Sequence, residues 1–181
     1  MAEALPITLR DAVAEDFDAI HAIYGHHVLH GLASFETEPP ARTELLRRHA
    51  DVVAHQLPYL VALSGAQVVG YAYAGPFRPR AAYRFTVEDS IYLAPDAIGR
   101  GIGRRLLSEL IARCTAAGRR QMIAVIGDSA NAGSIGLHRA LGFGEPWVMV
   151  GAGFKFGRWV DVVMMQRPLG PGAGTLPPPG A

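Results

Sequence analysis

The sequence Gly99-Arg100-Gly101-Ile102-Gly103 lies between a short β-type run, Ser90-Ile91-Tyr92-Leu93, and a helical stretch that begins near Arg104. Glycines at this spacing let backbone N–H groups turn toward one point, where a helix begins and its first donors lack partners. Such a loop forms a small cup for an anion, usually phosphate or pyrophosphate, with Arg100, Arg104 and Arg105 beside it. A plain strand-to-helix turn is the alternative, so the interpretation depends on the rest of the chain.

Two familiar nucleotide-binding loops do not fit these residues. A P-loop ends in Gly-Lys followed by Ser or Thr, but Arg104 and Arg105 follow Gly103 in this sequence. A dinucleotide-binding fingerprint that starts at Gly99 requires glycine or alanine at position 104. The loop therefore predicts an anion site of another kind.

Length and composition favour one domain with a substantial core. The chain has 181 residues, 50% of them hydrophobic, and a formal net charge of +1. We expect the domain to span residues 1–169 and a disordered Gly/Pro-rich tail to span residues 170–181. The arginines are scattered, which argues against a nucleic-acid-binding protein, since such proteins carry a dense basic stripe.

Cysteine content and apolar runs indicate the compartment. Cys114 is the one cysteine, so no intrachain disulfide can form. The first residues lack the basic and apolar regions of a secretory signal, and no apolar run is long enough to span a bilayer. We therefore expect a cytoplasmic protein without membrane contact.

Hydrophobic periodicity predicts strands that alternate with helices. Asp16 is expected to cap the first helix, and Gly118 and Gly142 are expected to end two later ones. Hairpins at both ends of the chain, with alternation between them, imply an α/β protein whose mixed sheet is covered by helices. The predicted strands are 7–10, 59–63, 67–74, 85–93, 121–126, 147–153 and 159–166, with a turn at 154–158; helices are predicted after Asp16, over 43–55, from about Arg104 and over 132–141.

An acidic residue, Glu88, lies on the strand that leads to the glycine loop. Strand alternation sends Glu88 and Ser90 to one face and Asp89 to the other. A carboxylate on a central strand is unfavourable to bury without a reason. One explanation is a general base that takes a proton from an incoming ammonium, with a pKa raised by partial burial. The other is a structural carboxylate held by an arginine such as Arg84.

Polar residues also gather at the start of the helix predicted over 132–141. Asn131 and Ser134 are ordinary residues for a helix N-terminus, and they could equally bind the amides of an extended cofactor arm. His138 follows four residues after Ser134 on the same helix face. It could protonate a departing thiolate, or it could be a core or surface histidine.

The loop 75–83 combines Arg78 and Arg80 with the aromatic residues Phe77 and Tyr83. Arginines can bind a carboxylate through two parallel hydrogen bonds, and aromatic rings can enclose an apolar side chain, although a solvated loop is also compatible. A metal site is not expected, because no acid or cysteine completes a zinc pattern with the helix histidines. These histidines are His21, His26, His27 and His30.

Several motifs are specific when their order and spacing are taken together. They are Ser34-Phe35-Glu36, the segments 75–83 and 86–92, the 99–103 loop, Asn131, Ser134, and the segments 137–143 and 157–161. With these motifs the chain resembles the GNAT N-acetyltransferase superfamily up to about Leu169, and within it the group that acetylates phosphinothricin, methionine sulfone and methionine sulfoximine. The resemblance implies a mixed, mostly antiparallel sheet of about seven strands, flanked by helices and splayed at its two central strands.

The resemblance also implies an activity and a site. It implies acetyl-CoA as cofactor, no metal, and direct transfer of the acetyl group to the α-amino group of a small acceptor in a ternary complex. A homodimer is expected, with the region of Trp159 helping to complete the site. The implied catalytic residues are Glu88 and His138; the implied acceptor residues are Phe35, Glu36, Arg78, Arg80, Tyr83 and Thr86; the implied cofactor residues are Ile91, Tyr92, Leu93, Gly99, Arg100, Gly101, Ile102, Gly103, Arg104, Asn131 and Ser134.

Two positions depart from the common GNAT pattern. Ile98 stands where these loops usually have Gln or Arg, so one side-chain contact to the pyrophosphate is absent. His138 stands where many GNAT enzymes have a tyrosine acid, although histidine is familiar in the phosphinothricin group. Two other functions remain open: a GNAT enzyme that acts on protein N-termini or another amine, and a non-catalytic module that binds acyl-CoA.

Overall fold

The computed structural model describes residues 5–177 of the chain. A seven-stranded sheet runs through the molecule in the order β1-β2-β3-β4-β5-β7-β6. Neighbouring strands are antiparallel except for β4 and β5, which are parallel. The strands are β1 (Ile7–Asp11), β2 (Tyr59–Ser64), β3 (Gln67–Pro76), β4 (Thr86–Leu93), β5 (Gln121–Gly127), β6 (Trp147–Lys155) and β7 (Arg158–Pro168). The predicted mixed and mostly antiparallel α/β sheet is confirmed.

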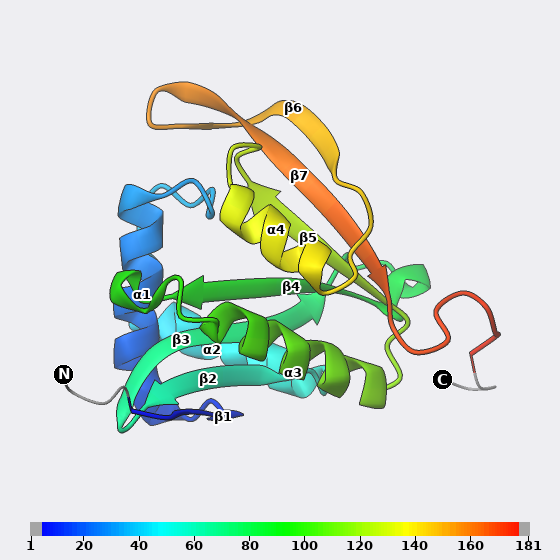
Figure 1. Cartoon of the computed structure of the whole chain (residues 1–181), viewed down its shortest axis with the longest axis horizontal. Helices are drawn as coiled ribbons and strands as arrows, with labels where there is room; N and C mark the ends of the chain where they lie inside the picture. The colour runs from blue at the N-terminus through cyan, green and yellow to red at the C-terminus, as the bar shows by residue number, and fades with distance from the viewer. Residues whose placement is uncertain (1–4, 178–181) are drawn as a thin grey trace.

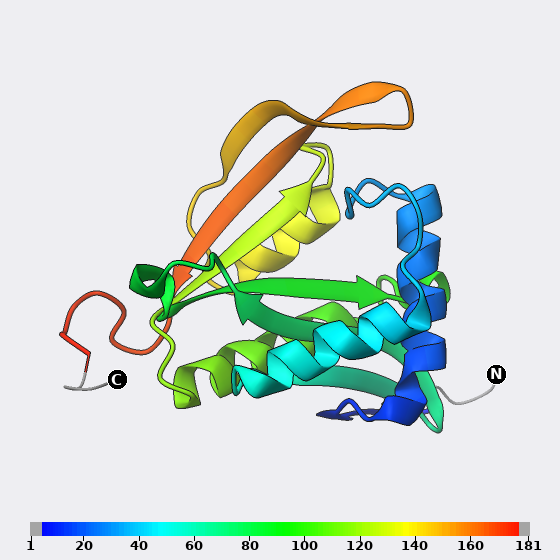
Figure 2. The same cartoon turned by 180° about the vertical axis from the view of Figure 1, so that it is seen from behind.

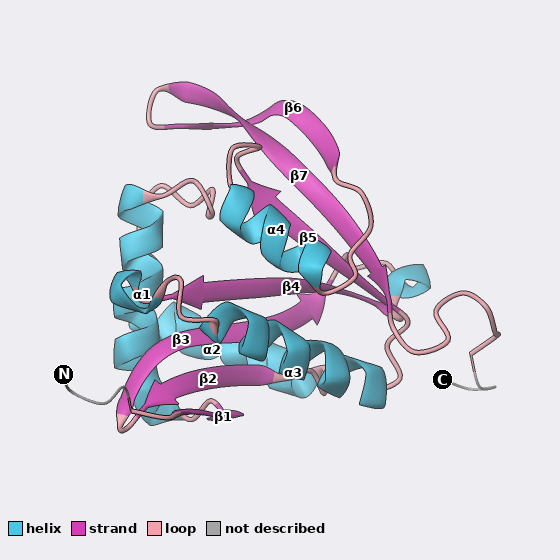
Figure 3. Cartoon of the chain, viewed as in Figure 1, coloured by secondary structure: helices cyan, strands magenta, loops and turns pink. Residues whose placement is uncertain are grey.

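Helices cover both faces of this sheet (Figures 1 and 2). Helix α3 (Ile102–Ala116) connects the parallel strands β4 and β5, and it packs against β2, β3 and β4. A parallel pair needs such a crossover, since a hairpin joins only antiparallel strands. Helix α4 (Ala132–Ala140) lies on the same side as α3, whereas α1 (Phe17–His30) and α2 (Arg42–Ala54) pack on the opposite face (Figure 3).

Most predicted elements are found within a few residues of their expected bounds, with three differences. Helix α3 begins at Ile102, and so the last glycine of the loop belongs to its first turn. Strands β6 and β7 extend through most of the predicted turn at 154–158 and leave only residues 156 and 157 between them. Asp16 does not cap α1; its carboxylate accepts a hydrogen bond from the backbone N–H of Val13 and pairs with Arg10 at 2.6 Å.

Gly118 and Gly142 end α3 and α4 as predicted. Both have positive φ, +76° at Gly118 and +82° at Gly142, a backbone conformation in which glycine carries no steric penalty. At each end, the N–H groups of the glycine and of the following residue donate to carbonyls in the last helical turn. These turns set where each helix stops and where the next strand enters the sheet.

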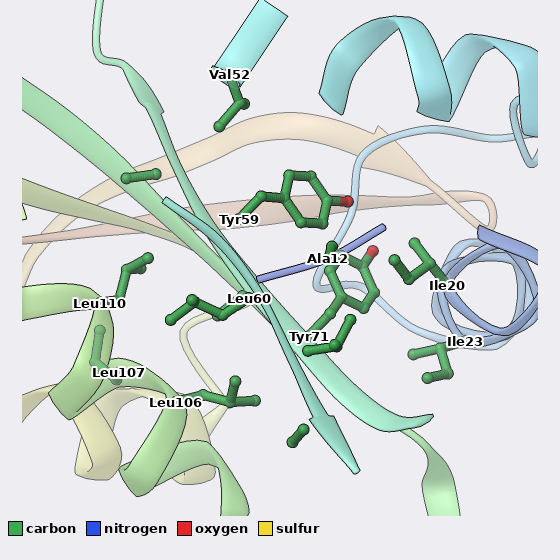
Figure 4. Packing of buried hydrophobic residues seen from close by; sticks show 14 of the residues in the cluster. Ala12, Ile20, Ile23, Val52, Tyr59, Leu60, Tyr71, Leu106, Leu107 and Leu110 are labelled. Atoms are coloured by element: carbon green, nitrogen blue, oxygen red, sulfur yellow. The ribbon is translucent and has the colours of Figure 1, made fainter. Parts of the chain in front are cut away.

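The core lies on both faces of the sheet (Figure 4). On the α3 side, Leu106, Leu107 and Leu110 are fully buried, as their helical spacing predicts, and Leu60 of β2 is fully buried as well. On the other side, α1 contributes Ile20 to the buried residues. Burial of each such side chain stabilises the fold by roughly 1.5–3 kcal/mol, which gives β4 a rigid support.

The structure describes residues 170–177 of the Gly/Pro-rich tail, and the disorder of this tail stays a prediction. The Arg120 guanidinium donates hydrogen bonds to the carbonyls of Gly172 and Leu176 and to the hydroxyl of Thr175. Residues 178–181 lie outside the described residues. Along the described residues, no helix combines the length and apolar character that crossing a membrane requires.

Candidate active site

Strands β4 and β5 separate halfway along their length. Their pairing covers Thr86 to Asp89 on β4 and Gln121 to Ala124 on β5, and it stops there. Beyond this point the facing edges of the two strands present backbone N–H and C=O groups that the partner strand does not satisfy. The predicted splay of the two central strands is therefore present, and an extended ligand could lie in it as a strand does.

The glycine loop lies at the open end of this gap. Gly99 and Gly101 have φ values of +80° and +75°, and Gly101 directly precedes the first residue of α3. No side chain caps this helix, so the first N–H groups of α3 face the loop. This backbone geometry is what the predicted anion cup requires, and the charges of Arg100, Arg104 and Arg105 nearby would favour an anion there.

A cleft of about 490 Å³ joins the gap to the glycine loop. Asn131 and Ser134 at the start of α4 also line it, and the Asn131 carboxamide oxygen accepts a hydrogen bond from the Ser134 N–H at 3.1 Å. Asn131 thus caps the helix and keeps its amide NH2 as a donor for a ligand. All but one of the predicted cofactor residues line the cleft, the exception being Arg100. Those that line it are Ile91, Tyr92, Leu93, Gly99, Gly101, Ile102, Gly103, Arg104, Asn131 and Ser134.

Glu88 lies one residue before the strands separate. Its side chain points to the face covered by α1 and α2, as do those of Ser90 and Tyr92, because alternate residues of a strand share a face. Burial, and secondly the charge of neighbouring Asp89, raise the pKa of the Glu88 carboxyl to about 7. A neighbouring arginine would lower this pKa, so burial and the charge of Asp89 outweigh any such effect at Glu88.

Asp89 points to the opposite face, where it meets His138 of α4. The Nε2 atom of His138 lies 3.0 Å from the Asp89 carboxylate, and both side chains are buried. The Nδ1 atom lies 2.7 Å from the Ser134 carbonyl oxygen. Burial lowers the pKa of His138, but the hydrogen bond and charge of Asp89 outweigh it and leave the pKa raised.

These contacts argue against the predicted role of His138 as the acid for a departing thiolate. His138 lines the cleft, yet protein oxygens already occupy both of its ring nitrogens. A proton donor to the ligand needs an N–H directed at it. The structure instead makes His138 the residue that ties α4 to β4.

The predicted acceptor residues form two groups. Around the short helix η2 (Ala81–Tyr83), the guanidinium of Arg78 lies 5.0 Å from the ring centroid of Phe77 and 5.7 Å from that of Tyr83. Thr86 begins β4 next to them and accepts a hydrogen bond from the Phe77 N–H at 3.3 Å. Arg80 precedes η2 and is exposed.

The second group, Phe35 and Glu36, follows α1. Phe35 is 40% exposed. The Glu36 carboxylate accepts hydrogen bonds from the Tyr24 hydroxyl at 2.9 Å and from Arg48 at 2.6 Å. Within residues 5–177, no hydrogen bond, ion pair or ring contact joins this group to the Arg78 group, so the structure does not bring the two groups together.

Sequence reasoning missed three polar partners. Asp89 holds His138, Arg48 holds Glu36, and Lys155 binds the segment that contains Phe35. The first could have been found, because a carboxylate on a buried strand face requires a partner from the helix above it. The other two contacts join segments far apart in the sequence, and no local spacing signals them.

The histidines of α1 contact one another without forming a metal site. The rings of His26 and His30 lie 4.9 Å apart, and His27 meets the Leu93 carbonyl oxygen at 2.8 Å. Within residues 5–177, no group of three or more His, Cys, Asp or Glu side chains could hold a metal ion. Cys114 is a buried, unpaired core residue.

Comparison with known proteins identifies the family. Residues 20–143 match the model of the acetyltransferase (GNAT) family. The chain belongs to the GNAT family. It is 56% identical over 170 residues to the phosphinothricin N-acetyltransferase of Alcaligenes faecalis, covering 94% of this chain and 86% of that protein. It is 44% identical to the L-methionine sulfoximine/L-methionine sulfone acetyltransferase of Pseudomonas aeruginosa, covering 91% of this chain and 95% of that protein.

A solved structure supports the same assignment for this GNAT chain. The phosphinothricin acetyltransferase of Sinorhizobium meliloti in complex with AcCoA superposes with a TM-score of 0.93 and 55% sequence identity, covering 97% of this chain and 95% of that one. The resemblance inferred from the motifs, the N-acetyltransferase assignment and the GNAT fold are thereby confirmed.

Proposed function

We propose that this GNAT protein transfers an acetyl group from acetyl-CoA to the α-amino group of a small amino-acid-like acceptor. The proposed acceptors are of the phosphinothricin, methionine sulfone or methionine sulfoximine type, which the relatives' names suggest. The observation that carries the proposal is the position of Glu88, a half-buried carboxyl with a pKa of about 7, on β4 one residue before the strands separate. Glu88 does not itself line the cleft, whose lining on β4 begins at Asp89 and Ser90.

The cleft fits coenzyme A in both shape and chemistry. The unsatisfied edge of β4 beyond Asp89 offers backbone groups to the amides of a pantetheine arm, and Asn131 and Ser134 face it from α4. The helix N-terminus at Gly101 suits the pyrophosphate. Acetyl-CoA, when bound, supplies the acetyl group as a reactive thioester.

Glu88 is proposed to act as the general base. An amine attacks a thioester only after it loses a proton, because the ammonium form has no lone pair. With a pKa of about 7, Glu88 is close to half ionised at neutral pH and can accept that proton directly or through a water molecule. Direct attack in a ternary complex then needs no covalent enzyme intermediate.

The acceptor is proposed to bind on the Glu88 face of β4. Arg80 and Arg78 can hold its carboxylate through paired hydrogen bonds, with the rings of Phe77 and Tyr83 beside them. Thr86 and the Phe35 ring complete the proposed pocket. Glu36 already has partners in Arg48 and Tyr24. We therefore propose that it fixes the wall of the acceptor pocket and does not bind the amine.

We also propose that the protein is a cytoplasmic homodimer. The β6–β7 hairpin projects from the sheet (Figure 1) and exposes an apolar surface, which water disfavours. A second copy of the chain could cover it, and sedimentation analysis would show a dimer; a monomer at assay concentration would reject this part of the proposal. The exposed apolar side chains are Trp147, Val148, Met149, Val150, Phe154, Phe156 and Trp159.

The deciding experiment follows thiol release from acetyl-CoA. The panel contains phosphinothricin, methionine sulfone, methionine sulfoximine, ordinary amino acids and a short peptide. Selective turnover of the first three supports the proposal. Turnover of the peptide alone would replace the acceptor by a protein N-terminus, and tight acetyl-CoA binding without turnover of any amine would indicate a binding module.

A further inference from the structure

Lys155, the one lysine of the chain, is buried at the end of β6. Its ammonium donates hydrogen bonds to two carbonyl oxygens, that of Gly31 at 2.9 Å and that of Ser34 at 2.6 Å. Lysine is rarely buried unless its charge is compensated. Here the compensation comes from backbone carbonyls of the segment after α1, so the β6–β7 hairpin is tied to that segment through one side chain.

The tied segment, residues 31–36, borders the active-site cleft. Ala33 lines the cleft together with Gly127 at the end of β5. Figure 2 shows the loop after α1 reaching toward the end of β5 and the β6–β7 hairpin. The segment therefore lies next to the end of β5 that is not paired with β4. Its position affects the shape of the cleft at this end.

Two glycines provide the space that the segment occupies. A β-carbon at Gly127 would overlap the Leu32 carbonyl oxygen and would lie 3.2 Å from the Phe35 ring. A β-carbon at Gly153 would overlap the Phe35 ring itself. One side of this ring is thus seated against the backbone of β5 and β6, while 40% of the residue remains exposed.

The segment is held at its other end by a separate set of contacts. Glu36 is bound by Tyr24 and Arg48, and the Ser34 hydroxyl lies 2.9 Å from the Tyr24 hydroxyl. These contacts fix Glu36 to α1 and α2, but none of them reaches the hairpin. Within residues 5–177, the side-chain hydrogen bonds from the hairpin to this segment come from Lys155, and one of them is made next to Phe35, at the Ser34 carbonyl.

We propose that Lys155 is a positioning residue that sets acceptor specificity, by holding the 31–36 segment so that the Phe35 ring forms a fixed wall of the acceptor pocket. The inference rests on the proposed function, because it takes Phe35 to face the acceptor. It assigns Lys155 no contact with acetyl-CoA and no part in proton transfer. The acceptor class is an amino acid with a compact polar side chain, which a fixed aromatic wall would distinguish from side chains of different bulk or polarity.

The test replaces Lys155 by methionine, which keeps the length of the chain and removes the donor. We expect Lys155→Met to raise the acceptor KM about tenfold and to leave kcat and the acetyl-CoA KM within about twofold, since it removes uniform acceptor binding. The preference for methionine sulfone over methionine should fall by a similar factor. Arg113→Met is the matched control, because Arg113 forms ion pairs with Asp11 and Glu109 on the outer side of α3.

A double-variant cycle separates positioning from general stability. Phe35→Ala should also raise the acceptor KM about tenfold, and adding Lys155→Met should change it by no more than about twofold more, because the effect passes through Phe35. Gly153→Ala should reproduce the KM increase while the Lys155 hydrogen bonds stay intact. If Lys155→Met does not fold, the acceptor KM of Gly153→Ala decides the test.

Each outcome counts for or against the inference. An unchanged acceptor KM in Lys155→Met or Gly153→Ala, an equal rise in the acetyl-CoA KM, or a hundredfold effect in the double variant would overturn it. A wild-type protein that acetylates none of the small acceptors would refute the proposed function instead, and the inference with it.

Discussion

Glu88 and Asp89 are adjacent on β4 and carry the same functional group, yet their surroundings differ completely. Glu88 points toward α1 and α2, where burial raises its pKa to about 7. Asp89 points toward α4, where His138 holds its carboxylate at 3.0 Å. The comparison shows that strand alternation, rather than residue type, divides the two tasks: one carboxyl can exchange a proton, and the other anchors a helix.

The largest expected effect tests the Glu88 face. Glu88→Gln keeps the shape of the side chain but cannot accept a proton, so we expect kcat/KM to fall by roughly 10²–10⁴-fold. Acetyl-CoA binding, measured by calorimetry, should stay within about twofold of wild type. A variant with wild-type turnover at neutral pH would remove the distinction between the two carboxyls.

The next effect tests the Asp89 face. Asp89→Asn should lower the free energy of unfolding by about 3 kcal/mol at pH 6, because it removes one charge from a buried pair. The pKa of His138 is higher in the folded protein than in the unfolded chain. The ion pair therefore stabilises the fold fully below the pKa that His138 has in the unfolded chain, and this stabilisation is lost as the pH rises through the folded-state pKa. Urea unfolding should therefore show a smaller difference at pH 9; an equal loss at both pH values would contradict the ion pair.

Glu88 shows the same direction of linkage as His138, because both pKa values are raised, but its substitution should have the opposite effect on stability. Its pKa is raised from 4.5 to about 7, so its ionisation destabilises the fold as pH rises from about 4.5 to 7. Glu88→Gln should then raise the free energy of unfolding by about 2 kcal/mol at pH 8, allowing for partial solvent screening, and hardly change it at pH 5. Destabilisation at pH 8 would show that Glu88 has a favourable partner.

The smallest of these effects concerns the acceptor. Arg80→Ala should raise the acceptor KM about tenfold, equivalent to about 1.4 kcal/mol, by removing a charged contact to a carboxylate. The acetyl-CoA KM should not change. Gly101→Ala is the matching variant in the predicted cofactor loop, because a side chain at position 101 is strained at a φ of +75°. Equal effects of Arg80→Ala on both KM values would exclude Arg80 from the acceptor site.

Local sequence signals predicted much of the fold and the conformation of the loop on the predicted cofactor side. The 99–103 loop, the helix ends at Gly118 and Gly142, and the alternation around Glu88 each depend on residues close together in the chain. For this reason their conformations could be read from spacing. The anion cup and the splayed strands follow from the same local features once the family resemblance is added.

The hydrogen-bond partners of individual side chains could not be predicted in the same way. Asp16 looked like a helix cap, but Arg10 and the Val13 N–H bind its carboxylate one turn earlier. The role of His138 as an acid stays a prediction, although its two ring nitrogens contact Asp89 and the Ser134 carbonyl. The spacing of a helix cap does not indicate the Arg10–Asp16 pair, whereas a partner for Asp89 on the helix above β4 could have been expected.

The most direct measurement is the pH dependence of kcat/KM for acetyl transfer in wild type, Glu88→Gln and Asp89→Asn. We predict that the wild-type rate rises with pH through a midpoint near 7 and that Glu88→Gln lacks this rise. In Asp89→Asn the rise should remain and move to lower pH, because the charge of Asp89 helps to raise the Glu88 pKa. A rise near pH 7 that persists unchanged in Glu88→Gln would contradict the assignment of Glu88 as the base.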